Sequence, residues 1–151
     1  IRDFCLSRGL GDVYKRQLID VATLTGACVV ALGDRYTGAF SNSDELMSKI
    51  VQASILAGEN IWRLPMGDEE YDNLNASTVA DIANCGKKCG ATAAARFLGE
   101  FVEKKPWVHL DIAGTSESDE DTEIYSKGGT GAATMLLYEV VKLMEKPYKS
   151  Y

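Results

Sequence analysis

Few side chains of this sequence have the types and spacing that catalysis requires. His109 is the only histidine, and it shares one face of a predicted strand with Asp111. A single histidine on a strand is usually a hydrogen-bonded core residue. No G-x-S-x-G motif is present, and nothing in the sequence suggests a Ser-His-Asp or Cys-His arrangement for nucleophilic catalysis.

Two clusters are weak candidates for binding a metal ion. Cys85 and Cys89 are separated by three residues, but two thiols without a second pair make a poor zinc site. The simpler interpretation is a loop with two reduced cysteines. The segment Glu117–Glu123 is acidic but lacks the Asp/Asn/Gly/Glu spacing of a calcium loop, so we expect a solvated acidic loop.

Two glycine-containing segments could bind a ligand through the backbone. Lys127–Gly131 precedes a predicted helix, and a glycine-rich helix start offers unpaired N–H groups to an anion; the alternative is plain N-capping by Thr130. Thr23–Gly26 follows a predicted strand. Its glycine lets a second backbone approach, and free N–H and C=O groups at a strand end can pair with an extended peptide. From spacing alone, a mere tight turn remains the alternative.

Composition indicates one globular domain. The chain has 151 residues, 46% of them hydrophobic, which is enough for a core. Its net charge of −6 argues against a broad nucleic-acid surface. No apolar run reaches the roughly 20 residues that span a bilayer, and residues 1–17 lack the apolar region of a secretory signal. The four cysteines are few and unevenly spaced, which favours reduced thiols in the cytoplasm.

The remaining pattern alternates strands with helices and predicts an α/β fold. The expected strands are Leu18–Leu24, Thr37–Ser41, Ile61–Pro65 and Trp107–Ile112. The expected helices are one capped by Ser43 and closed by Gly58, one over Thr92–Glu103 and one over Gly131–Glu145. Ala27–Leu32 is too short for periodicity to decide between helix and strand, and residues 66–90 are polar and irregular.

Periodicity also predicts which faces are buried. Along the last strand, Val108, Leu110 and Ile112 face one way, and Trp107, His109 and Asp111 face the other. The expected inner stripes of the three helices are Met47, Ile50, Val51 and Ile55; Ala94, Phe97, Leu98 and Phe101; and Ala133, Leu136, Leu137, Val140, Val141 and Met144.

Residues 1–17 differ from the rest of the chain. They carry a net charge of +2, from four basic and two acidic residues, and show no periodicity. The segment resembles a non-native tail left by sequencing or gene assembly, so we expect it to be foreign to the fold. An ordinary flexible arm is the alternative.

Six separated segments, in order, resemble the catalytic domain of the leucyl aminopeptidase family over residues 18–146. They are Asp20–Ala27, Gly38–Asn42, Trp62–Pro65, Asp81–Asn84, His109–Gly114 and Lys127–Gly131. The resemblance implies a mixed sheet flanked by helices, here the C-terminal part of that domain over residues 18–151. It also implies a cytoplasmic homohexamer that removes N-terminal amino acids from peptides, using two divalent ions, zinc or manganese.

The resemblance places the substrate side of the site in this chain. Leu24, through its carbonyl, and Gly26, through its amide, would align the peptide backbone. Thr23, Cys85 and Ala113 would line the pocket for the N-terminal side chain, although Cys85 replaces a more usual aliphatic residue. His109 and Asp111 look like scaffold. The family's Asn-Thr-Asp-Ala-Glu-Gly-Arg segment, with two of its metal ligands, is missing where residues 1–17 stand.

No acidic residue matches a ligand position of the family, so we expect no bound metal ion, no catalytic side chain and no activity from this chain alone. The missing part should also leave apolar surface and a sheet edge exposed. Two other functions stay open. One is a non-catalytic interaction module with the same fold, and the other is a phosphate-binding α/β domain that uses Lys127–Gly131.

Overall fold

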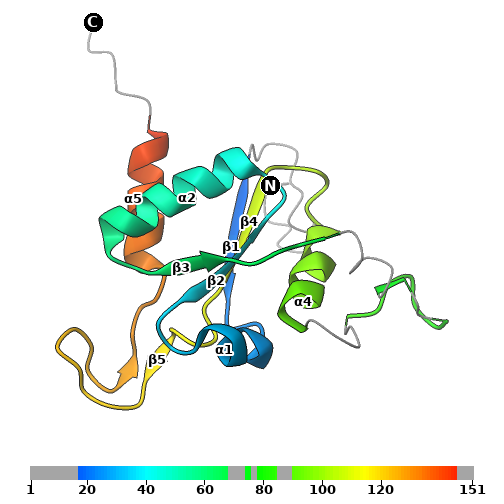
Figure 1. The fold of residues 1–151 in the computed structure, drawn as a ribbon. Coiled ribbons are helices and arrows are strands. Elements are labelled where there is room, and N and C mark those ends of the chain that lie inside the picture. The colour runs from blue at the N-terminus through cyan, green and yellow to red at the C-terminus, as the bar shows by residue number, and fades with distance from the viewer. Residues whose placement is uncertain (1–16, 68–73, 76–77, 85–89, 146–151) are drawn as a thin grey trace, which may run out of the picture.

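A four-stranded mixed sheet forms the centre of the molecule (Figure 1). The computed structural model describes residues 17–67, 74–75, 78–84 and 90–145. The strands are β1 (Leu18–Ala22), β2 (Thr37–Ser41), β3 (Ile61–Arg63) and β4 (Trp107–Asp111), in the spatial order β1-β4-β2-β3. β1 pairs parallel with β4, β4 antiparallel with β2, and β2 parallel with β3. The fold class implied by the resemblance is therefore confirmed.

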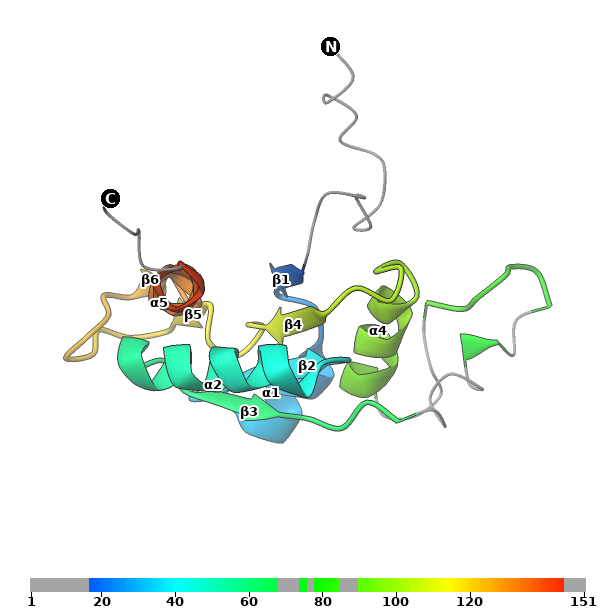
Figure 2. The same ribbon diagram turned by 90° about the horizontal axis from the view of Figure 1, so that it is seen from above.

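Helices cover both faces of this sheet. α2 (Asp44–Ala57) and α5 (Thr134–Met144) pack together on one face, and α1 (Gly26–Leu32) and α4 (Gly90–Gly99) lie on the other. In Figure 2, α5 and α4 lie on opposite sides of β4. The two-residue strands β5 (Glu117–Ser118) and β6 (Gly128–Gly129) form a separate hairpin. No helix in the described ranges is long and apolar enough to cross a membrane.

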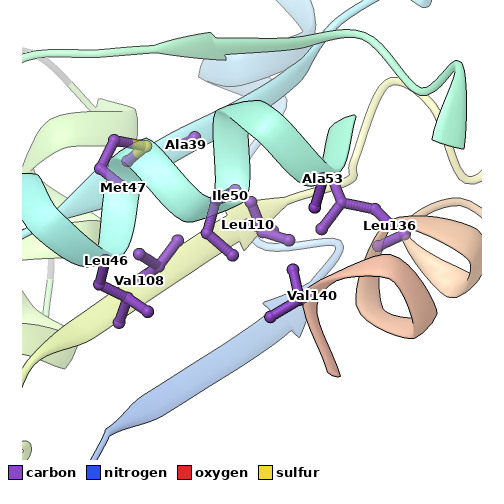
Figure 3. Packing of buried hydrophobic residues seen from close by; sticks show 10 residues of the cluster. Ala39, Leu46, Met47, Ile50, Ala53, Val108, Leu110, Leu136 and Val140 are labelled. Carbon is purple, nitrogen blue, oxygen red and sulfur yellow. The ribbon is translucent and has the colours of Figure 1, made fainter. Parts of the chain in front are cut away.

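The alternation predicted for β4 produces two separate cores. Val108 and Leu110 pack with Ile50 of α2 and Leu136 of α5 (Figure 3). Trp107 points to the opposite face and packs in a second cluster with residues of α1 and α4. All five residues of β4 are buried, which is the pattern of a central strand covered by helices on both faces. The predicted facing of this strand is confirmed.

Local signals set the helix ends. The Ser43 hydroxyl accepts a hydrogen bond from the N–H of Leu46, as expected of an N-cap, and Gly58 ends α2 in the left-handed region with φ of 70°. The ambiguous segment Ala27–Leu32 belongs to a helix, because Thr25 caps α1 by accepting from the N–H of Cys28 at 3.1 Å.

Some residues predicted to lie on the buried faces of the helices are exposed. In α2, Val51 and Ile55 are exposed, and Leu46 and Ala53 are buried in their place because the helix turns that face toward α5 and the sheet. In α5, Val141 is exposed for the same kind of reason. Helical periodicity predicts that one stripe is apolar, but the packing partner selects which of two adjacent stripes is buried.

The helix predicted over Thr92–Glu103 is shorter than expected. It ends at Gly99, and its buried residues are small: Ala91, Ala93 and Ala95. These small side chains let α4 pack against α1 and the second core, while Phe101 lies beyond the helix and is 47% exposed. Glu103 and Lys104 then adopt positive φ, which is incompatible with continuing the helix.

Candidate functional site

The segment Thr23–Gly26 joins the end of β1 to the start of α1, and a single carboxylate holds it. Oδ1 of Asp111, at the end of β4, accepts hydrogen bonds from the N–H groups of Leu24 at 3.0 Å, Thr25 at 3.4 Å and Ala113 at 3.1 Å. Asp111 is 1% exposed, so these donors replace the water that its charge would otherwise need. The segment is therefore a fixed turn and not a loose connection.

Thr25 connects this turn to α1. Its hydroxyl donates to Oδ2 of Asp111 at 2.7 Å and accepts from the N–H of Cys28 at 3.1 Å. One side chain thus caps the helix and occupies the second oxygen of the carboxylate. Because both partners have fixed positions, the backbone between them is held in one conformation.

The turn leaves two backbone groups available. Within the described part of the chain, the Leu24 carbonyl and the Gly26 N–H have no hydrogen-bond partner. Gly26 is the first residue of α1, where intrahelical acceptors are missing. Thr23, Leu24 and Gly26 are exposed, and a Cβ added at Gly26 would meet nothing within 4 Å. An extended chain can therefore reach a C=O and an N–H at this strand end.

Ala113 lies beside the turn, because its N–H bonds to the same Asp111 oxygen as that of Leu24. Four of the five site residues expected from the sequence, namely Thr23, Leu24, Gly26 and Ala113, are therefore grouped around Asp111. Cys85, the fifth, lies outside the described residues, as does Cys89.

A second carboxylate lies on the same side of the sheet, below the turn. Asp20 of β1 accepts from Nε1 of Trp107 at 2.5 Å and is 2.6 Å from Nδ1 of His109. His109 is fully buried and stacks on the rings of Phe40 and Trp107, with centroids 6.0 and 6.3 Å away. His109 therefore joins two strands within the core.

The described carboxylates do not fit a metal site. Asp20 and Asp111 both accept hydrogen bonds from protein donors on each of their oxygens, so both carboxylates are engaged within the fold. The described residues contain no group of three or more His, Cys, Asp or Glu side chains that could hold a metal ion.

One thiol lies against this site. Cys28, the free cysteine of the described residues, is buried, and its Sγ lies 3.8 Å from the Asp111 carbonyl oxygen. Burial raises the pKa of the Cys28 thiol, and the negative charge of Asp111 raises it further; a backbone hydrogen bond from Gly38 acts in the opposite direction. A thiol held neutral in this way is a poor nucleophile.

The Glu59 carboxylate binds backbone N–H groups at the start of α5. Glu59 accepts from the N–H of Ala133 at 2.5 Å and from the N–H of Leu136 at 3.0 Å. Thr130 is not the N-cap, since that position is Ala133, and the Thr130 hydroxyl instead donates to the Thr115 carbonyl at 2.5 Å. The predicted Thr130 cap is therefore wrong, and Glu59 binds two N–H groups at the start of α5 that would otherwise be open to an anion.

The profile of the cytosol aminopeptidase family, catalytic domain, matches residues 8–138. The chain belongs to this family. Among curated relatives, the probable cytosol aminopeptidase of Alkaliphilus metalliredigens (strain QYMF) is 50% identical over 143 residues, which cover 94% of this chain and 28% of the relative. The probable cytosol aminopeptidase of Picosynechococcus sp. (strain ATCC 27264 / PCC 7002 / PR-6) is 50% identical over 115 residues, covering 76% of this chain and 23% of the relative.

Solved structures agree with this assignment. A mutant of tomato leucine aminopeptidase aligns with a TM-score of 0.77 and 43% identity, over 83% of this chain and 24% of that one. Bottromycin maturation enzyme BotP in complex with Mn aligns with a TM-score of 0.83 and 40% identity, over 90% of this chain and 30% of that one.

This chain spans only about a quarter of the length of the curated relatives described here. The family match begins at residue 8, within the segment that was expected to be foreign to the fold. Residues 1–16 lie outside the described structure.

Sequence reasoning missed the roles of Asp20 and Thr25 at the site and of Glu59 at the start of α5. Asp20 had a detectable signal, since it is a charged residue inside an otherwise apolar strand and must find a partner there. Thr25 precedes a helix whose existence the sequence left open. Glu59 had no local signal, because its partners are more than 70 residues away in sequence.

Proposed function

We propose that this chain is the substrate-binding part of an aminopeptidase that removes N-terminal amino acids from peptides. The exposed Leu24 carbonyl and Gly26 N–H would pair with the backbone of the bound peptide, and Thr23, Cys85 and Ala113 would line the pocket for its first side chain. The observation that carries the proposal is the Asp111 carboxylate, which fixes both the turn and Ala113.

Backbone pairing suits a peptidase of broad specificity. A C=O and an N–H recognise the repeating part of any extended peptide, so affinity arises without selection of a particular side chain. The open space at Gly26 is needed for this purpose, because a side chain there would stand where the peptide backbone approaches.

In the whole protein, hydrolysis would be performed by two divalent ions, zinc or manganese, bound by residues other than the described ones. The Mn in the BotP complex supports a metal-dependent reaction in this family. The whole protein would act as a cytoplasmic homohexamer. The described residues contain no group of three or more His, Cys, Asp or Glu side chains that could hold a metal ion, and we propose that this chain alone does not hydrolyse peptides.

Peptide binding is tested by titrating the ¹⁵N-labelled chain with a leucyl tripeptide. We expect chemical-shift changes centred on Leu24, Gly26 and Ala113. Gly26→Ala should abolish them while leaving stability unchanged or slightly raised, because alanine favours a helix over glycine by up to about 1 kcal/mol. Gly67→Ala is the matched control, since its Cβ also meets nothing within 4 Å.

Two results would contradict the proposal. Shift changes confined to other parts of the chain, or equal in the Gly26→Ala variant, would remove the turn as the binding site. Clear hydrolysis of leucine p-nitroanilide by this chain with added Mn²⁺ or Zn²⁺ would show that inactivity is wrong.

A further inference from the structure

Asp20 and Asp111 each form hydrogen bonds that connect β1 with β4, one from each strand. Asp111 belongs to β4 and holds the turn that follows β1. Asp20 belongs to β1 and holds two side chains of β4, those of Trp107 and His109. Asp20 and His109 are direct partners in the parallel register of the two strands.

This cross-strand contact matters because β1 is an edge strand of the described sheet and pairs there only with β4. The turn begins directly after β1, at Thr23. A shift of β1 along β4 would move Leu24 and Thr25 away from the Asp111 oxygens. Side-chain bonds that resist this shift therefore help to hold the turn in place.

The hydrogen-bonding requirements of Asp20 determine which ring nitrogen of His109 carries a proton. An ionised carboxylate only accepts hydrogen bonds, and Asp20 has two oxygens facing two donors, Nε1 of Trp107 and Nδ1 of His109. Nδ1 must then carry the imidazole proton. Nε2 is buried and has no partner among the described residues, so a second proton there would be an unpaired donor in an apolar site.

We propose that Asp20 and His109 are positioning residues for the turn Thr23–Gly26. His109 is neutral, with its proton on Nδ1, and donates it to Asp20, so that β1 stays in register and Asp111 stays beneath Leu24 and Thr25. That this arrangement helps peptide binding rests on the proposed function. The position of the His109 proton and the conformation of the turn do not depend on it.

The first test uses the chain without substitution. Its single histidine gives one pair of ring ¹⁵N signals in a long-range ¹H–¹⁵N spectrum, so no assignment is needed. We expect a protonated, pyrrole-type Nδ1 and a bare, pyridine-type Nε2. A bare Nδ1 with a protonated Nε2, or a fully protonated ring at neutral pH, would overturn the proposal.

The second test compares two variants that separate hydrogen bonding from packing. In His109→Asn the amide nitrogen takes the place of Nδ1 and can still donate to Asp20. In His109→Gln the side chain is closer to histidine in size, but its nitrogen corresponds to Nε2. If packing alone mattered, glutamine would be the better substitute; the proposal predicts that asparagine is.

The measurement is hydrogen exchange at the N–H groups of Leu24 and Thr25. Loss of the donor in His109→Gln should speed exchange about tenfold or more, while His109→Asn stays close to the unmodified chain. Ile50→Val, in the core on the other face of the sheet, controls for general destabilisation. Equal exchange in both His109 variants would overturn the proposal.

These outcomes are independent of peptide binding. A correct tautomer and exchange pattern together with no peptide binding would refute the proposed function and leave the positioning pair intact. Peptide binding with the opposite tautomer would do the reverse. If neither variant folds, the tautomer measurement on the unmodified chain still decides.

Discussion

The carboxylate of Glu59, just beyond the end of α2, binds the N–H groups of Ala133 and Leu136 at the start of α5. The capping position itself is Ala133, whose backbone is left-handed and whose side chain cannot accept a hydrogen bond. Glu59 therefore supplies from a distant segment what an N-cap residue normally supplies locally, and it joins the ends of two helices that pack together.

Replacing Glu59 should destabilise the chain. Glu59→Gln removes the negative charge at a helix N-terminus and weakens two hydrogen bonds, so we expect a loss of about 1–2 kcal/mol in the free energy of unfolding, measured in urea. Glu120→Gln, on the exposed loop of the β5–β6 hairpin, is the control and should change little. Equal effects of the two variants would show that Glu59 does not cap α5.

The bond between Thr25 and Asp111 should be energetically coupled. Asp111→Ala and Thr25→Val each remove one partner of the 2.7 Å hydrogen bond, so the double variant should lose less stability than the sum of the two single variants. For a charge-assisted bond to a buried carboxylate, we expect a coupling of about 1–3 kcal/mol from a double-mutant cycle. Simple additivity would mean that Thr25 and Asp111 hold the turn independently.

Because β2 and α1 pack closely at Gly38 and Cys28, we predict that a substitution at Cys28 partly reverses the effect of one at Gly38. A Cβ added at Gly38 would lie 2.6 Å from Sγ of Cys28, a contact that real structures do not tolerate. Gly38→Ala should therefore cost about 1–3 kcal/mol in thermal or urea unfolding. Cys28→Ala removes the sulfur, and the double variant should recover part of the loss; a double variant less stable than either single one would contradict this contact.

The sequence predicted those parts of the fold that local pattern determines. The bounds of β2, the Ser43 cap and the two faces of β4 are confirmed because each depends on residues within a few positions of one another. The exposure of Val51 and Ile55 was not predictable, since it depends on where α5 packs. The Asp20–His109 pairing required the register of β1 on β4, and no local pattern specifies that register.

The Cys28 thiol should make stability decrease at alkaline pH. Burial and the charge of Asp111 raise its pKa in the folded chain, so above about pH 9 the unfolded chain loses this proton before the folded chain does. The contribution is complete below that pH and is lost as pH rises toward the folded pKa. We expect the free energy of unfolding to fall more steeply above pH 9 in the unmodified chain than in Cys28→Ala.

Mass spectrometry after iodoacetamide treatment at pH 8 should also show Cys28 unmodified until urea unfolds the chain. Rapid labelling of Cys28 in the folded chain would mean that the thiol is neither buried nor held neutral.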